Sequence, residues 1–137
     1  ADLAAMATYL LGEPEPPVKP IVPAKVSAKI SESGQRTYFA VCAGCHGMEG
    51  EGLPHVAVPL RTNSSLRLPS PRGFLTPVMH GITEQHFPGL ERMQAMPGFA
   101  ATLSDQEIAD LATWMRATWG GQGAQISTTE VAQLRRQ

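Results

Sequence analysis

The stretch Cys42-Ala43-Gly44-Cys45-His46 decides how the rest of this 137-residue chain is understood. Two cysteines separated by two residues and followed at once by histidine have the spacing at which a c-type haem is attached. Two thiols one helical turn apart can add to the two vinyl groups of one porphyrin, and the next imidazole can then ligate the iron from the same side. We therefore predict one haem c, bound covalently through Cys42 and Cys45, with His46 as an axial ligand.

A zinc site and a redox-active dithiol are the two alternatives for this motif. A structural zinc site needs four ligands, usually further Cys or His at short spacing. These are the only two cysteines in the chain, and the remaining histidines, His55, His80 and His86, are scattered singly. A thioredoxin-like pair follows a β-strand, whereas a helix-like segment leads into this motif. Both alternatives are disfavoured.

The composition agrees with one small domain built around a large apolar cofactor. Aromatic residues are only 6% of the chain, while 13 glycines and 12 prolines favour short helices joined by irregular loops. The formal net charge of −1 makes nucleic acid a poor partner. No run of about 18 apolar residues is long enough to span a membrane, and the opening does not have the pattern of a signal peptide. Because thioether attachment of haem implies an extracytoplasmic compartment, we expect a periplasmic mature product or a fragment of one.

The sequence divides into four segments. Residues 1–12 are predicted to form a helix ending at Gly12, 13–29 a proline-rich linker, 30–121 the haem domain, and 122–137 a C-terminal tail with a short helix over 127–134. The arginine pair near the end of the tail is too small a cluster to interpret.

The opening helix resembles a segment near the end of the domain. Ala7-Thr8-Tyr9-Leu10 aligns with Ala112-Thr113-Trp114-Met115, and the flanking apolar and acidic positions also correspond. Either any two amphipathic helices match this well, or residues 1–12 are the last helix of a preceding haem domain. The sequence leaves both open.

Within the domain, the first and last helices are the clearest elements. Residues 31–42 are predicted to be helical, capped by Ser31 or Ser33, and Gly34 suggests that another helix crosses there. The last helix begins with a capping box at Ser104 and Glu107 and ends at Gly120. Between them, 47–70 and 91–99 are expected to be loops, and 71–80 a short helix.

Pro77 lies inside that short helix. Because proline breaks long helices, we expect the helix to begin only at Thr76 or Pro77.

The second axial ligand of the iron must come from the face opposite His46. Met48 is too close in sequence, Met6 precedes the linker, and Met79 and Met115 are expected in the core. Of the remaining two methionines we favour Met96, because Pro97-Gly98 makes the adjacent loop rigid. Met93, His80 or an open iron site are the alternatives.

The imidazole of His46 needs an acceptor for its second ring nitrogen. Metal-bound histidines normally donate that N–H to a carbonyl or carboxylate, which fixes the ring. We predict that Pro59 provides the carbonyl, since a proline residue is rigid.

With these motifs in order, the chain resembles a class I cytochrome c over residues 30–121. The resemblance rests on the Cys42–His46 motif, Met96-Pro97-Gly98-Phe99, and the last-helix segment 103–111. It implies an all-α fold of short helices and loops wrapped around one haem, with the first and last helices crossing at Gly34 and Trp114. A narrower resemblance, carried by segments 78–82, 119–123 and 130–135, is to the last haem domain of multi-haem subunits that partner membrane-bound periplasmic dehydrogenases.

Three functions follow from this interpretation. The leading one is one-electron transfer through a His46/Met96-ligated haem, from a periplasmic dehydrogenase to a cytochrome, oxidase or quinone-linked acceptor of the respiratory chain, the chain itself being no enzyme. The alternative is a peroxidase-like catalyst or gas sensor with an open iron, for which His80 or His86 would supply a distal acid–base group. A third is an interaction module that ties a dehydrogenase to a membrane.

Overall fold

The computed structural model describes residues 3–12, 20–89 and 92–137. Its elements, in chain order, are helices α1 (Leu3–Leu11), α2 (Ala28–Val41) and α3 (Ala43–His46), the 3-10 helix η1 (Ser64–Arg67), helix α4 (Arg72–His80), strands β1 (Gln85–His86) and β2 (Arg92–Met93), and helices α5 (Asp105–Gly120) and α6 (Thr128–Arg135). The predicted all-α class is confirmed. The predicted loops are not entirely irregular, because η1 lies in one and β2 in the other.

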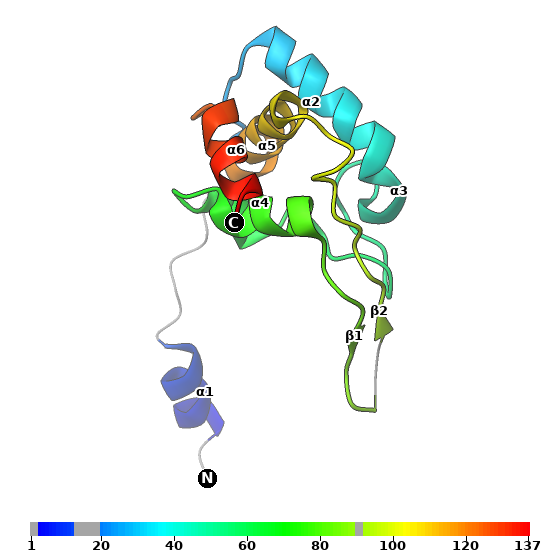
Figure 1. Cartoon of the computed structure of the whole chain (residues 1–137). Helices are drawn as coiled ribbons and strands as arrows, with labels where there is room; N and C mark the ends of the chain where they lie inside the picture. Colours follow the sequence, from blue (N-terminus) through cyan, green and yellow to red (C-terminus); the bar gives the residue numbers. More distant parts are fainter. Residues whose placement is uncertain (1–2, 13–19, 90–91) are drawn as a thin grey trace.

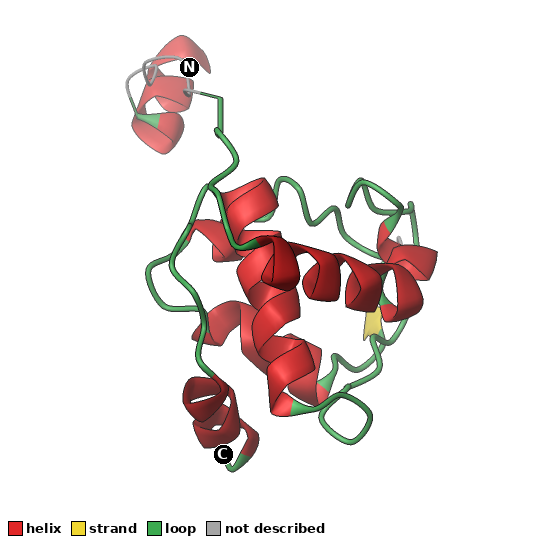
Figure 2. Cartoon of the chain, turned by 90° about the horizontal axis from the view of Figure 1, so that it is seen from above, coloured by secondary structure: helices red, strands yellow, loops and turns green. Residues whose placement is uncertain are grey.

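The molecule is organised around the crossing of α2 and α5 (Figures 1 and 2). At the crossing, a Cβ atom added to Gly34 would lie 2.5 Å from Trp114 Cβ and 2.6 Å from the Asp110 carbonyl oxygen. The two backbones therefore meet where only glycine fits, as the sequence predicted. Tyr38, one turn further along α2, packs its ring 5.4 Å from that of Trp114 and 5.2 Å from that of Trp119.

Helix α2 begins earlier than its sequence suggested. Ser27, and not Ser31 or Ser33, is the cap: its side chain accepts a hydrogen bond from the Ile30 N–H at 3.3 Å. Any of the three serines could cap a helix on local grounds. Ser27 is the cap because the chain just before it is held against α5 by the Ala24–Ala117 hydrogen bond.

Residues 21–24 run as a strap across the C-terminal end of α5, so the predicted linker ends too late in the sequence. The Ala24 N–H donates to the Ala117 carbonyl at 2.9 Å. A Cβ on Gly121 would lie 3.2 Å from Ile21 Cγ2 and from the Val22 carbonyl oxygen. These residues belong to the domain, while 13–19 lie outside the described residues.

Helix α5 has the predicted ends. Ser104 and Glu107 form the capping box, and Gly121 ends the helix in the left-handed region with φ 67°. The helix is the buried centre of the fold, with Ile108, Leu111 and Met115 at most 2% exposed.

Helix α4 begins at Arg72 and contains Pro77 in its second turn, so the predicted later start is wrong. A proline there removes the N–H that would bond the carbonyl of Gly73. Gly73 is exposed, with no atom within 4 Å of where its Cβ would be, so water can bond that carbonyl instead. The buried face of the helix, Phe74, Leu75, Val78 and Met79, stabilises it.

The C-terminal tail is part of the domain and not an appendage. The predicted short helix is present as α6, capped by Ser127, and it packs against α4 and α5. Val131 and Leu134 are buried, and the Ile126 N–H donates to Thr113 Oγ1 at 3.0 Å. The predicted domain end at residue 121 is therefore too early.

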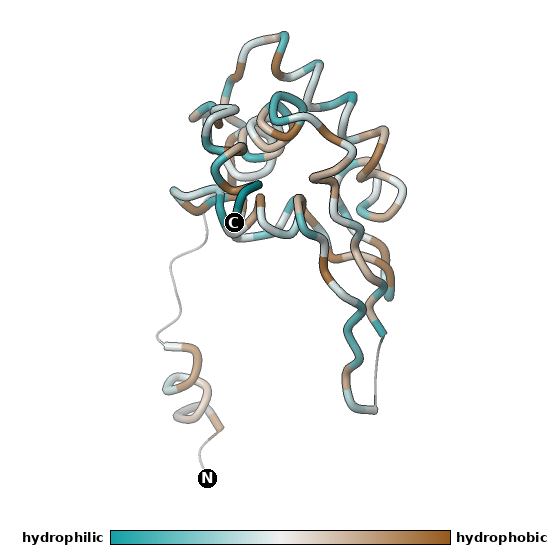
Figure 3. Tube along the Cα trace, viewed as in Figure 1, coloured by the Kyte–Doolittle hydropathy of each residue, from teal (hydrophilic) through white to brown (hydrophobic). Residues whose placement is uncertain are grey.

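Helix α1 is rich in apolar residues, which colour its trace brown in Figure 3, and their side chains are exposed. Leu3 is 78% exposed, Tyr9 89% and Leu11 81%. Within the described ranges, each helix falls short of the length and apolarity that a membrane crossing requires.

Replacing Gly34 with alanine should destabilise the protein by about 1–3 kcal/mol, because the new methyl group meets backbone that cannot move aside. Gly73→Ala is the matched control: the same change in a helix, with open space around the added atom. It should be neutral or slightly stabilising. Urea unfolding of both variants measures the difference, and equal midpoints would show that the crossing is loose.

Deleting residues 1–19 should leave the melting temperature unchanged, because the strap and every element around the domain core lie within 20–137. Deleting residues 1–26 also removes the Ala24–Ala117 hydrogen bond and the cover over Gly121. That larger deletion should cost about 1 kcal/mol or more, a few degrees in Tm. Thermal unfolding followed by circular dichroism compares the two. A stable 27–137 fragment would mean that the strap is not part of the fold.

Candidate functional site

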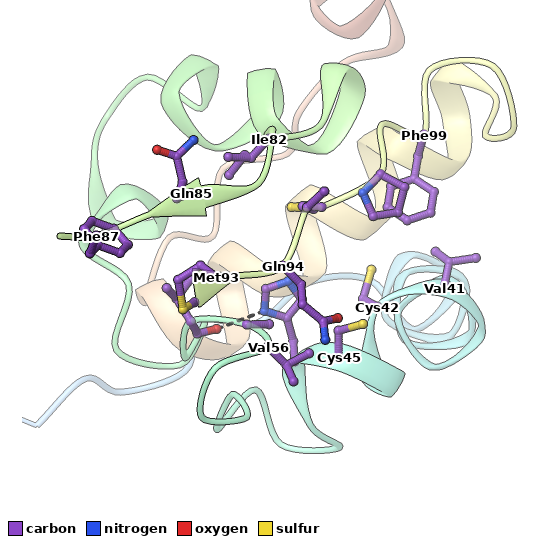
Figure 4. Close-up of a pocket in the computed structure, with 16 residues that line it drawn as sticks. Val41, Cys42, Cys45, Val56, Ile82, Gln85, Phe87, Met93, Gln94 and Phe99 are labelled. Atoms are coloured by element: carbon purple, nitrogen blue, oxygen red, sulfur yellow. Dashed lines mark hydrogen bonds between the residues drawn. The ribbon is translucent and has the colours of Figure 1, made fainter. Parts of the chain in front are cut away.

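A cavity of about 260 Å³ lies between the Cys42–His46 turn, the residues just before Pro59, the β1–β2 ribbon and the segment after β2. Figure 4 shows Ile82, Gln85, Phe87 and Met93 on its ribbon side and the two cysteines across from them. Apart from His46 and two glutamines, the lining is apolar or sulfur-bearing. The lining residues are Val41, Cys42, Cys45, His46, Val56, Ala57, Val58, Ile82, Gln85, Phe87, Met93, Gln94, Ala95, Met96, Pro97 and Phe99.

One helical turn brings both cysteines and His46 to the same wall of the cavity. Cys42 ends α2 and its carbonyl accepts the N–H groups of Cys45 at 3.2 Å and His46 at 3.0 Å, which closes α3. Both thiols are free. Burial, with a smaller contribution from Cys45, raises the pKa of the Cys42 thiol to about 12. One wall of the cavity thus carries two free thiols and one imidazole.

The imidazole of His46 is buried and held by one hydrogen bond, drawn as the dashed line in Figure 4. Its Nδ1 lies 2.9 Å from the Val58 carbonyl oxygen, so Nδ1 carries the proton and Nε2 keeps its lone pair for a metal. The predicted acceptor, Pro59, is wrong by one residue. The rigid amide is the one that joins Val58 to Pro59, and its carbonyl group belongs to Val58.

The backbone just after His46 is also fixed. The Tyr38 hydroxyl donates to the Gly47 carbonyl at 2.5 Å, and the Gly52 N–H donates to the His46 carbonyl at 2.7 Å. Burial raises the pKa of the Tyr38 phenol to about 12, so it remains a donor over the ordinary pH range. The helix crossing is thereby connected directly to the turn that carries the imidazole.

Both methionines left open by the sequence, Met93 and Met96, line the cavity, but their backbones are held differently. Met96 makes two hydrogen bonds with Ile82, each of 2.9 Å, and its side chain packs against the core. Met93 pairs with Gln85 in the two-residue ribbon.

Two glycines let the chain beside Met96 lie directly on the end of α4. A Cβ on Gly98 would be 2.6 Å from the Met79 carbonyl oxygen, and one on Gly81 would be 2.5 Å from the Met96 carbonyl oxygen. The position of Met96 is therefore fixed by backbone contacts that larger residues would prevent.

Several lining residues were not foreseen from the sequence. Val56, Val58 and Phe87 line the cavity without belonging to any motif, and only their apolar character could have indicated them. Neither His80 nor His86 contributes to the lining. In the described part of the chain, His46 is the one histidine there.

The family to which the chain belongs indicates the cofactor that this cavity binds. Residues 30–115, more than half of the chain, match the family described as "Cytochrome C oxidase, cbb3-type, subunit III". The chain belongs to the class I c-type cytochromes. A domain of this family carries covalent haem c and serves in electron transfer.

Curated relatives of this cytochrome domain are dehydrogenase subunits. A nicotinate dehydrogenase subunit from Pseudomonas putida is 35% identical over 85% of this chain and 10% of its own length. The cytochrome c subunit of alcohol dehydrogenase (quinone) from Gluconacetobacter polyoxogenes is 30% identical over 98% of this chain and 31% of its own. The gluconate 2-dehydrogenase cytochrome c subunit of Pantoea cypripedii is 30% identical over 77% and 24%. The chain thus spans a tenth to a third of the length of these relatives.

Among solved structures, the c-type cytochrome XoxG from Methylobacterium extorquens AM1 is similar to the cytochrome domain. It has a TM-score of 0.49 and 27% identity, over 71% of this chain and 55% of that one.

The residues of the cytochrome domain fit haem c. Two free thiols and an imidazole bonded to a carbonyl through Nδ1 share one wall of an apolar cavity, which matches a porphyrin that is bound through two thioethers and one histidine. Among the described residues no cluster of three or more His, Cys, Asp or Glu side chains could hold a metal ion on its own.

Replacing Tyr38 with phenylalanine should change how stability depends on pH. The phenol pKa is about 12 in the folded protein against 10.0 ordinarily. The wild-type protein therefore keeps the phenol's contribution below pH 10 and loses it as pH rises toward 12. The gap in unfolding free energy between wild type and Tyr38→Phe should be constant at lower pH and shrink above pH 10. A gap that stays constant up to pH 12 would contradict the assigned pKa.

Proposed function

We propose that this domain relays single electrons through haem c whose iron is ligated by His46 and Met96, accepting them from a periplasmic dehydrogenase and passing them to a respiratory-chain acceptor. The observation that carries the proposal is one apolar cavity lined by both the Cys42–His46 turn and a methionine fixed by backbone pairing. When bound, haem c supplies a couple between ferric and ferrous iron.

The residues around the cavity are suited to hold the same two ligands on the iron in both oxidation states. The Val58 carbonyl holds His46 in one tautomer and makes its Nε2 a better donor to iron. A thioether as the second ligand raises the reduction potential relative to a second imidazole. The predominantly apolar walls favour a porphyrin over water in the cavity.

Met96 is favoured over Met93 because its backbone is fixed on both sides. Its hydrogen bonds to Ile82 and the close contact of Gly98 with Met79 place it on the rigid end of α4. Met93 is half-buried in a two-residue ribbon whose other members, Gln85, His86 and Arg92, are exposed. A ligand that must stay bound in both oxidation states needs the more rigid support.

The partners are inferred from the relatives. Two of these relatives are the cytochrome c subunits of an alcohol dehydrogenase (quinone) and a gluconate 2-dehydrogenase. A donor of that class, in the periplasm where c-type haem is attached, would supply electrons to this domain. A catalyst or sensor with an open iron has less support, because neither His80 nor His86 lines the cavity.

The exposed helix α1 supports a multi-haem arrangement in which it is the last helix of another haem domain. Leu3, Met6 and Leu10 are 78%, 52% and 72% exposed. Their counterparts in the aligned segment of α5 (Ile108, Leu111 and Met115) are at most 2% exposed. The same pattern is thus buried in the helix that has a partner.

Replacing Met96 with alanine in the haem-loaded protein should abolish the long-wavelength absorption band of a ferric thioether complex and allow carbon monoxide to bind the ferrous form. Met93→Ala is the matched control, since it removes a thioether from the same cavity, and it should leave the band in place. Visible spectroscopy measures both. Loss of the band in Met93→Ala alone would assign the ligand to Met93, and a band absent from the wild type would refute His/Met ligation.

A further inference from the structure

Arg135, near the end of α6, bonds to the loop between the cavity and α5. Its Nε donates to Asp105 Oδ1 at 2.7 Å and one terminal nitrogen donates to the Leu103 carbonyl at 3.0 Å, while the other donates to the Ala100 carbonyl. All three nitrogens of the guanidinium are therefore used, and every acceptor lies within six residues of the chain. The side chains of Arg135 and Asp105 are 26% and 35% exposed, so solvent screens this ion pair only in part.

The loop that Arg135 holds is continuous with the cavity wall. We call residues 96–103 the Met96 segment. Its first half is attached to Ile82 and to the end of α4, where the Phe99 N–H donates to the Val78 carbonyl at 2.9 Å and the Ala100 N–H to the Met79 carbonyl at 3.1 Å. Its second half is a turn in which the Thr102 and Leu103 N–H groups both donate to the Phe99 carbonyl. Arg135 supplies the donors for two carbonyls of this half.

Helix α6, which carries Arg135, is itself held firmly against the core. It buries Val131 and Leu134 and packs against both α4 and α5. The Met96 segment therefore lies between two attachments: α4 holds its beginning, and Arg135 on α6 holds its end. A planar fork with several fixed donors suits this task better than the single ammonium of lysine.

We propose that Arg135 is a positioning residue that fixes the Met96 segment and so keeps the Met96 thioether in the cavity. This inference rests on Met96 being the second axial ligand, as proposed above. Without Arg135 the turn loses both of its hydrogen bonds to α6, and α5 loses the ion pair at Asp105, so the segment should open more often. The C-terminal tail thereby helps to determine how easily an external ligand reaches the iron.

The test measures the affinity of the ferric, haem-loaded full chain for added imidazole, which must displace the thioether. A larger open fraction raises the apparent affinity in proportion. Arg135→Gln should raise it about tenfold. Arg135→Lys, which keeps the charge and loses the fork, should fall between Arg135→Gln and the wild type. Arg136→Gln is the matched control, because it removes the same charge from the adjacent, exposed residue and should leave the affinity unchanged.

A Met96→Ala background shows whether the effect passes through the ligand. There Arg135→Gln should add nothing, since the site is already open. Equal effects of Arg135→Gln and Arg136→Gln, a persistent effect in Met96→Ala, or a lower melting temperature with unchanged imidazole affinity would each overturn the proposal.

Amide hydrogen exchange separates this inference from the ligand assignment. If Met96→Ala does not raise imidazole affinity, the proposed ligation fails and the link to the iron fails with it. Faster exchange of residues 100–103 in Arg135→Gln, but not in Arg136→Gln, would still support Arg135 as the residue that fixes the segment. Unchanged exchange would refute that role as well.

Discussion

The contact of two backbones at Gly34 is the constraint on which the rest of this fold depends. Because no side chain separates α2 from α5 there, Tyr38 one turn away lies against Trp114 and Trp119. The Tyr38 hydroxyl then reaches the Gly47 carbonyl and fixes the backbone next to His46. The position of the His46 imidazole thus follows, in three short steps, from the absence of one Cβ atom.

A second pair of backbone contacts fixes the chain on the opposite wall of the cavity. Gly81 and Gly98 allow the segment with Met96 to lie against the end of α4, and the strap at Ala24 and the helix α6 close the domain from outside. The cavity is therefore bounded by elements that are far apart in sequence. Glycines where chains cross and hydrogen bonds where they turn fix the backbone around it.

Much of this could be predicted from the sequence where the signal is local. The Cys42–His46 spacing, the capping box at Ser104 and the steric meaning of Gly34 are each contained in a few adjacent residues. Long-range contacts could not be seen in this way. The sequence does not indicate that Ala24 bonds to α5, which moves the cap of α2 to Ser27, or that Arg135 reaches the loop before α5.

The error at Pro59 has a different origin. A carbonyl acceptor was correctly expected, but the rigid amide joins Val58 to Pro59, and its carbonyl belongs to Val58. The β1–β2 ribbon was missed because two-residue strands are too short to produce an alternating pattern.

The aromatic cluster at the helix crossing also gives the molecule a built-in optical reporter. The two tryptophans of the chain, Trp114 and Trp119, have ring centroids 5.2 Å apart, so all indole emission originates from one place. In a domain of this size, a bound porphyrin would quench that emission by resonance energy transfer. Fluorescence should therefore be nearly dark in the intact haem protein and should brighten only when the crossing separates from the haem or the haem is lost. Emission intensity thus reports on the contact between α2 and α5 without any added label.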